Sequence, residues 1–92
     1  MEEKKIFSNE EFEELISNMK IIDHGGYFDG ISIFVLYEAK KDNKSLWFIG
    51  CYFPNKKPKY LMVHEQNVEW IKELMKTDKE RLSSALYGLR CF

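Results

Sequence analysis

Residues 31–63 read ISIFVLYEAKKDNKSLWFIGCYFPNKKPKYLMV, and the central sheet can be inferred from this stretch. β-Branched and aromatic residues fill segments 31–39, 45–53 and 59–63, and clusters of Gly, Pro, Asn, Asp or Lys separate them. This composition is typical of strands joined by short turns, which connect antiparallel neighbours. We therefore predict a three-stranded antiparallel β-meander. Pro58 is tolerated because it stands at the entrance of a strand that can lie at the sheet edge.

Helical patterns lie on both sides of this stretch. Ser8 and Glu11 have the spacing of a capping box, and apolar residues follow at helical spacing, so a first helix should begin at Asn9. After His64 the apolar residues again recur at helical spacing, and Thr77–Glu80 indicates a capping box that opens a third helix. The predicted fold class is α+β, in the order α-β-β-β-α-α, with residues 1–92 forming a single domain; Ile21–Ile22 are compatible with a short additional strand.

Length and composition exclude several classes of protein. The chain has 92 residues, of which 45% are hydrophobic, 15% aromatic and 32% charged, so it can form one core and is too rich in core residues to be disordered. The longest uncharged apolar runs, 31–37 and 46–54, are far shorter than the roughly 18 residues of a membrane span. The charged start, residues 1–5, lacks the pattern of a secretory signal, which predicts a cytoplasmic protein.

Both faces of the predicted sheet are apolar. Side chains alternate between the faces of a strand, and this divides the segments into an aliphatic set and a more aromatic set with polar tips. An antiparallel sheet with one wet face normally alternates apolar and polar residues, so both faces here need a cover. Either the three helices divide between the two faces, or the helices cover the aliphatic face and a partner covers the aromatic face. We adopt the second hypothesis.

The predicted partner is another protein or a second copy of the chain in a homodimer, with no membrane contact. The predicted contact residues are those of the aromatic face: Phe34, Leu36, Phe48, Tyr52, Tyr60 and Met62. The predicted rim consists of residues of the first helix and of the glycine-rich segment 24–30: Glu10, Glu13, Glu14, Tyr27, Phe28 and Asp29. Segment 24–30 can act as a contact loop, or its aromatic side chains can fold back on the core.

We interpret the sequence as that of a small soluble inhibitor or adaptor that binds and occludes a host protein. The excess of 12 Lys over 2 Arg suggests AT-rich coding, as in phages and mobile elements, and therefore an anti-defence role. The alternative is an RNA- or DNA-binding module that uses turn lysines and sheet aromatics, because residues 40–64 carry six lysines and one acidic residue. The lysines belong to two turns, 40–44 and 56–59. In a meander these turns lie about 30 Å apart, at opposite ends of nine-residue strands, so they do not form one patch.

The sequence predicts no enzyme, no metal site and no cofactor. His24, His64, Cys51 and Cys91 are the residues from which a nucleophilic or metal site could be built, but their spacing matches no such motif. Two scattered cysteines are typical of reduced thiols rather than of a disulfide framework. Cys51 lies within an apolar segment, which favours a core position.

Overall fold

The structure is a computed structural model, and it describes residues 6–28 and 30–86. The described residues form one five-stranded antiparallel sheet, in the order β1-β5-β4-β3-β2, together with three α-helices and one short 3-10 helix. The elements in chain order are β1 (Ile6–Ser8), α1 (Asn9–Leu15), β2 (Lys20–Phe28), β3 (Ile33–Lys41), β4 (Lys44–Tyr52), β5 (Lys59–Val63), the 3-10 helix (Glu65–Asn67), α2 (Val68–Thr77) and α3 (Lys79–Leu86). None of the helices in these ranges is long and apolar enough to cross a lipid bilayer.

The prediction of a three-stranded meander is wrong, because β1 and β2 extend the sheet at its two edges. β2 runs through Gly25 and Gly26, which resemble a chain break in the sequence. A β-bulge accommodates them: Asp23 pairs with Tyr37 and Gly26 with Val35, so two residues of β2 lie opposite one residue of β3. β1 has three residues, too few for an alternating pattern, and it pairs with β5.

The helix starts follow local hydrogen bonds. α1 begins at Asn9 as predicted, and its capping box is confirmed: the Ser8 hydroxyl accepts from the Glu11 N–H, and the Glu11 carboxylate accepts from the Ser8 N–H. At α3 the predicted capping box is wrong, because a single cap hydrogen bond to Asp78 replaces it. The Asp78 carboxylate accepts from the Arg81 N–H at 3.1 Å, whereas the Thr77 hydroxyl donates to a carbonyl in the last turn of α2.

The predicted division of side chains between the two faces also needs correction. The β3–β4 turn has two residues, 42 and 43, so that Lys41 pairs with Lys44. This register places Phe34 opposite Cys51 and Leu36 opposite Ile49. Residues that pair directly share a face, so Phe34 and Leu36 belong with the mainly aliphatic residues of β4. A turn one residue longer or shorter would have reversed the relation between the strands.

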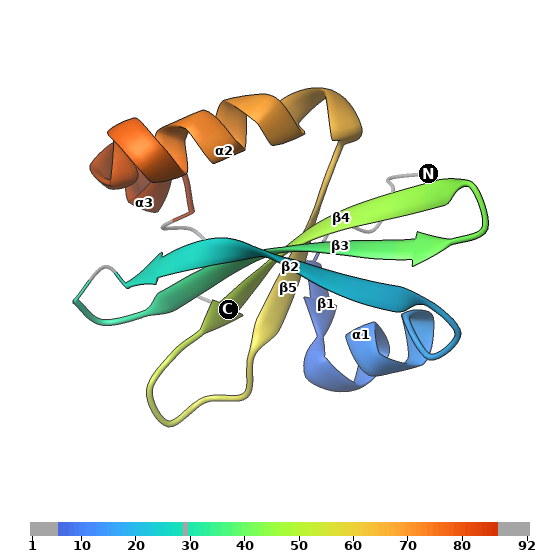
Figure 1. The fold of residues 1–92 in the computed structure, drawn as a ribbon. Coiled ribbons are helices and arrows are strands. Elements are labelled where there is room, and N and C mark those ends of the chain that lie inside the picture. The colour runs from blue at the N-terminus through green and yellow to red at the C-terminus, as the bar shows by residue number, and fades with distance from the viewer. Residues whose placement is uncertain (1–5, 29, 87–92) are drawn as a thin grey trace, which may run out of the picture.

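The helices divide between the two faces of the sheet. In Figure 1, α2 and α3 lie above the sheet and α1 lies below it, towards the end that carries the β3–β4 turn. The core under α2 and α3 contains the following buried residues: Tyr27, Phe34, Leu36, Trp47, Ile49, Cys51, Val68, Ile71, Leu74 and Leu82. The core under α1 contains Phe12, Ala39, Phe48 and Tyr60. The protein itself therefore covers much of the second face, which was the alternative left open by the sequence.

Candidate functional site

Four of the six predicted contact residues belong to the protein's own core. Phe34 and Leu36 lie in the core under α2 and α3, and Phe48 and Tyr60 lie in the core under α1. Packed side chains of this kind are unavailable to a second molecule in the folded state, so these four positions are withdrawn as contact residues. The alternation along each strand was predicted correctly, but β3 was assigned to the wrong faces, and helices cover both faces instead of one.

The other two predicted contact residues, Met62 and Tyr52, are half-buried. Met62 packs against the core under α1. Tyr52 pairs with Ile33 at the opposite end of the sheet, and its hydroxyl oxygen lies 2.6 Å from that of Tyr37. Tyr52 therefore lies on this face at the boundary between the region that α1 covers and the region that has no helix over it.

The predicted rim residues separate into two groups. Glu10, Glu13 and Glu14 are exposed on α1, as expected for the outer face of that helix. Tyr27 is buried, and its ring stacks on Phe34 with 5.2 Å between the ring centroids. Phe28, the next residue, is exposed, while Asp29 and Cys91 lie outside the described residues. Segment 24–30 thus places one aromatic ring in the core and the next one on the surface.

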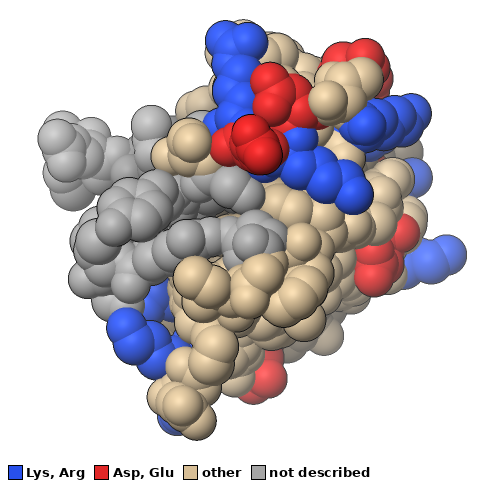
Figure 2. All heavy atoms as spheres, turned by 90° about the vertical axis from the view of Figure 1, so that its left-hand side faces the viewer, with Lys and Arg blue, Asp and Glu red and all other residues tan. Residues whose placement is uncertain are grey.

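An exposed apolar surface lies at the β2–β3 hairpin. We call it the hairpin patch and define it as Phe28, Ile31 and Ile33, whose side chains are 66%, 60% and 47% exposed. Phe28 pairs with Ile33, and Ile33 shares its face of β3 with Tyr37, so the pair lies on the α1 side of the sheet. Figure 1 shows that α1 lies at the other end of this face, and Figure 2 shows uncharged side chains gathered in the middle and lower part of the hairpin end.

A cavity of about 360 Å³ lies beside the bulge of β2, under the second half of α2. Its lining residues are His24, Gly25, Gly26, Lys72, Met75 and Lys76. Gly25 has a φ of +101° and its N–H donates to the Asp23 carboxylate at 2.7 Å, which holds the bulge in shape. A Cβ at Gly26 would lie 2.2 Å from the Phe34 carbonyl oxygen, so this close approach of β2 to β3 requires glycine.

Contacts with residues of the sheet fix the orientation of the His24 ring. Its Nε2 atom lies 2.9 Å from Glu38 Oε1, and the ring lies against Trp47 with 4.8 Å between the centroids. The Ser45 hydroxyl donates to the other Glu38 oxygen at 2.7 Å. The Ser45 and His24 hydrogen bonds outweigh desolvation and lower the pKa of Glu38. Because the ionised carboxylate can only accept, Nε2 of His24 carries the shared hydrogen.

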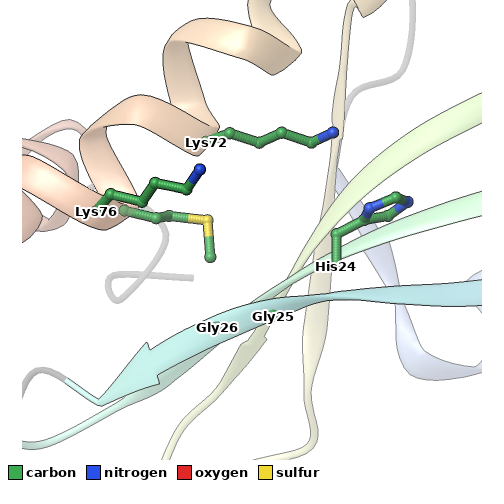
Figure 3. A pocket seen from close by; sticks show the side chains of 6 residues that line it. His24, Gly25, Gly26, Lys72 and Lys76 are labelled. Atoms are coloured by element: carbon green, nitrogen blue, oxygen red, sulfur yellow. The ribbon is translucent and has the colours of Figure 1, made fainter.

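Two ammonium groups stand over this cavity. In Figure 3, Lys72 and Lys76 reach from α2 across the space above Gly25 and Gly26, and the His24 ring rises from β2 towards α2. Lys72 Nζ lies 5.1 Å from the centroid of the Trp47 ring, a cation–π distance that limits where the ammonium can go. Lys76 is exposed. The cavity therefore combines positive charge with an oriented imidazole at the sheet edge.

The pKa values of the Cys51 thiol and of the Tyr52 and Tyr60 hydroxyls are raised rather than lowered, so none of these groups is activated as a nucleophile. Burial raises the pKa of Cys51 to about 12, so the thiol remains protonated at neutral pH. Burial also raises the pKa of Tyr52 and of Tyr60 above the ordinary value. Within the ranges that the structure describes, no three His, Cys, Asp or Glu side chains come together in an arrangement that could hold a metal ion.

The two lysine-rich turns lie at opposite ends of the sheet (Figure 1), as the β3–β4 and β4–β5 registers require. At the β4–β5 turn, Lys57 Nζ lies 2.6 Å from Glu10 Oε1, so an acidic residue of α1 offsets part of the charge. At the β3–β4 turn, Lys41 and Lys44 line a hollow of about 530 Å³, and Asp42 lies between them. Lys72 and Lys76 differ from these turn lysines because they line a cavity together with the oriented His24 ring.

Neither the hairpin patch nor the cavity was predicted as a whole, although Phe28 was a predicted rim residue and segment 24–30 a possible contact loop. The cavity joins residues 24–26 to residues 72–76, which are almost fifty positions apart in the chain and share no local pattern. A signal did exist for the patch, because Phe28, Ile31 and Ile33 flank Gly30 at a hairpin turn, where exposed apolar residues are unusual. Comparisons with models of known protein families, with curated proteins and with solved structures found no match.

Proposed function

We propose that this protein acts by binding another protein through the hairpin patch, as an inhibitor or adaptor. The observation that carries the proposal is the joint exposure of Phe28, Ile31 and Ile33 on a sheet whose other large apolar side chains are mostly packed under helices. Single exposed apolar residues are common on protein surfaces, but adjacent ones at the end of a hairpin are typical of contact sites.

The size of the patch favours a different protein over a second copy. The three side chains expose on the order of 300 Å², whereas a stable interface needs about 800 Å² from each partner. Covering that area contributes about 7.5 kcal/mol at about 25 cal/mol per Å², which is comparable to the cost of about 4–15 kcal/mol for association. The patch can therefore anchor a partner that adds contacts of its own, and it is too small to hold a symmetric dimer alone.

The test compares the wild-type protein with two variants as immobilised bait in a lysate of the organism that encodes it. Phe28→Ser removes the most exposed side chain of the patch, and Trp70→Ser removes a side chain of α2, 48% exposed, outside it. We expect a protein that the wild type and Trp70→Ser both retain and that Phe28→Ser loses. Because both positions are exposed, the unfolding midpoint of each variant should equal that of the wild type.

Three outcomes would overturn the proposal. If Phe28→Ser retains every protein that the wild type retains, the hairpin patch has no role in binding. If light scattering instead gives the wild type the mass of two chains, and Phe28→Ser the mass of one, the occupant of the patch is a second copy. Loss of binding by Phe28→Ser and Trp70→Ser alike would also contradict a specific role for the patch.

A further inference from the structure

The cavity beside the β2 bulge lies next to the hairpin patch. Gly26 lines the cavity, and Phe28 of the patch follows two residues later on the same strand, which corresponds to roughly 7 Å along β2. The cavity lies on the α2 side of the sheet and Phe28 lies on the α1 side. Because β2 is an edge strand, a single partner can contact its outer side and both faces at once. A molecule bound at the patch is therefore within reach of the cavity.

The charges around the cavity suit an anion of one negative charge. Lys72 and Lys76 contribute two ammonium groups. Glu69 lies 3.8 Å from Lys72 Nζ, and the lowered pKa of Glu38 keeps a second carboxylate ionised behind His24. These two negative charges balance the two ammonium groups, but neither carboxylate lines the cavity. A singly charged carboxylate can therefore share the ammonium groups with less repulsion from Glu69 and Glu38 than a doubly charged phosphate would meet.

The volume and walls of the cavity suit a side chain rather than a large ligand. At about 360 Å³ it falls at the lower end of the range of roughly 300–1,000 Å³ that small-molecule sites occupy. Met75 is half-buried and gives the cavity an apolar, adaptable wall on which methylene groups can pack. Apart from its chain neighbours, no atom of the described residues lies within 4 Å of the position that a Cβ at Gly25 would take, so the cavity is open beside this residue.

We infer that the cavity between α2 and the β2 bulge binds a carboxylate, supplied by an acidic side chain of the protein that docks on the hairpin patch. This inference rests on the proposed function for the identity of the partner. The carboxylate enters beside Gly25 and accepts hydrogen bonds from the ammonium groups of Lys72 and Lys76. An apolar side chain of the same partner contacts Phe28. The recognised chemistry is an acidic residue close to an apolar one.

The carboxylate site can be tested on the isolated protein. The ¹⁵N-labelled protein is titrated with sodium acetate, sodium phosphate or sodium chloride at constant ionic strength, and the amide resonances of Gly25 and Gly26 are followed. We expect acetate to shift both resonances to saturation, chloride to leave them unchanged, and phosphate to bind more weakly than acetate. The saturable shift should disappear when Lys72→Gln and Lys76→Gln are combined.

Matched variants separate the cavity from general charge effects. Lys40→Gln combined with Lys56→Gln removes two exposed lysines elsewhere and should keep the acetate response. Because Lys72 also contacts Trp47, the single variant Lys76→Gln serves as the second test, and it should weaken the response without lowering the unfolding midpoint. Equal responses in the two double variants, an absent acetate response or tighter binding of phosphate would each overturn the carboxylate assignment.

The same bait experiment connects the site to the partner. A protein that Phe28→Ser loses should also be lost by Lys76→Glu, which places a negative charge at the cavity, and should be retained by Lys56→Glu. If acetate binds but Phe28→Ser retains every protein, the proposed function fails while the carboxylate site stands. If Phe28→Ser loses a protein that Lys76→Glu still retains, the proposed function stands, and the inference that the partner places an acidic side chain in the cavity is overturned.

Discussion

At the scale of single residues, Glu38 connects the bulged edge strand to the sheet. Its carboxylate accepts from the Ser45 hydroxyl and from His24, and these two residues belong to β4 and β2. The lowered pKa means that the folded protein stabilises the ionised form of the Glu38 carboxyl more than the unfolded chain does. This stabilisation is present above the ordinary Glu pKa, and it is lost as the pH falls through the lowered pKa of the folded state.

Glu38→Gln should lower the free energy of unfolding by about 1–2 kcal/mol at neutral pH, since hydrogen bonds to a charged group are replaced by neutral ones. The difference from the wild type should shrink as the pH falls below the ordinary Glu value of 4.5. Urea denaturation at a series of pH values measures both effects. Glu10→Gln is the control, because the Glu10–Lys57 pair is exposed and its loss should leave the midpoint unchanged. A constant difference at all pH values would contradict the assigned role of the Glu38 charge.

At the scale of elements, α1 determines how much of the second face is covered. Its seven residues place Phe12 over the sheet, where the ring stacks on Tyr60 at 3.7 Å between centroids and meets Phe48 edge-on at 5.0 Å. A helix of this length spans roughly 10 Å, which is about a third of a nine-residue strand. The hairpin patch is exposed because α1 does not extend over that end of the sheet (Figure 1).

Phe12→Ala should lower the free energy of unfolding by about 3–5 kcal/mol, the usual cost of removing a buried phenylalanine ring. Leu15→Ala, at an exposed position of the same helix, is the matched control and should change it by less than about 1 kcal/mol. Urea denaturation followed by far-UV circular dichroism gives both values. If the two substitutions cost the same, α1 is not the cover of the second face.

Local sequence signals predicted the elements better than their arrangement. The capping box at Ser8 and the strand Lys59–Val63 were found because their signals lie within a few adjacent residues. Of β2 only a short strand at Ile21–Ile22 was anticipated, because Gly25 and Gly26 interrupt its pattern, although a bulge allows the strand to continue. The faces of β3 were wrong because the register depends on which two residues of the polar segment 40–44 form the turn. The cavity requires the packing of α2 on β2, which no short segment encodes.

At the scale of the whole molecule, the sheet has two edges that resist pairing with another sheet. β1 is three residues long, and β2 carries the bulge at Gly25 together with an exposed Lys20. α2 and α3 cover one face and α1 covers part of the other. The hairpin patch offers too little area for a symmetric interface. Neither the two sheet edges nor the hairpin patch therefore provides a strong drive for dimerisation.

The protein should accordingly sediment as a single chain over a wide range of concentration, and Phe28→Ser should sediment in the same way. Sedimentation velocity measures the mass directly, with a sample in high salt as a control for charge-driven association between the acidic and basic segments. A dimer that persists on dilution and is lost in Phe28→Ser would show that the hairpin patch pairs with itself. A dimer that persists in Phe28→Ser would instead place the contact outside the hairpin patch.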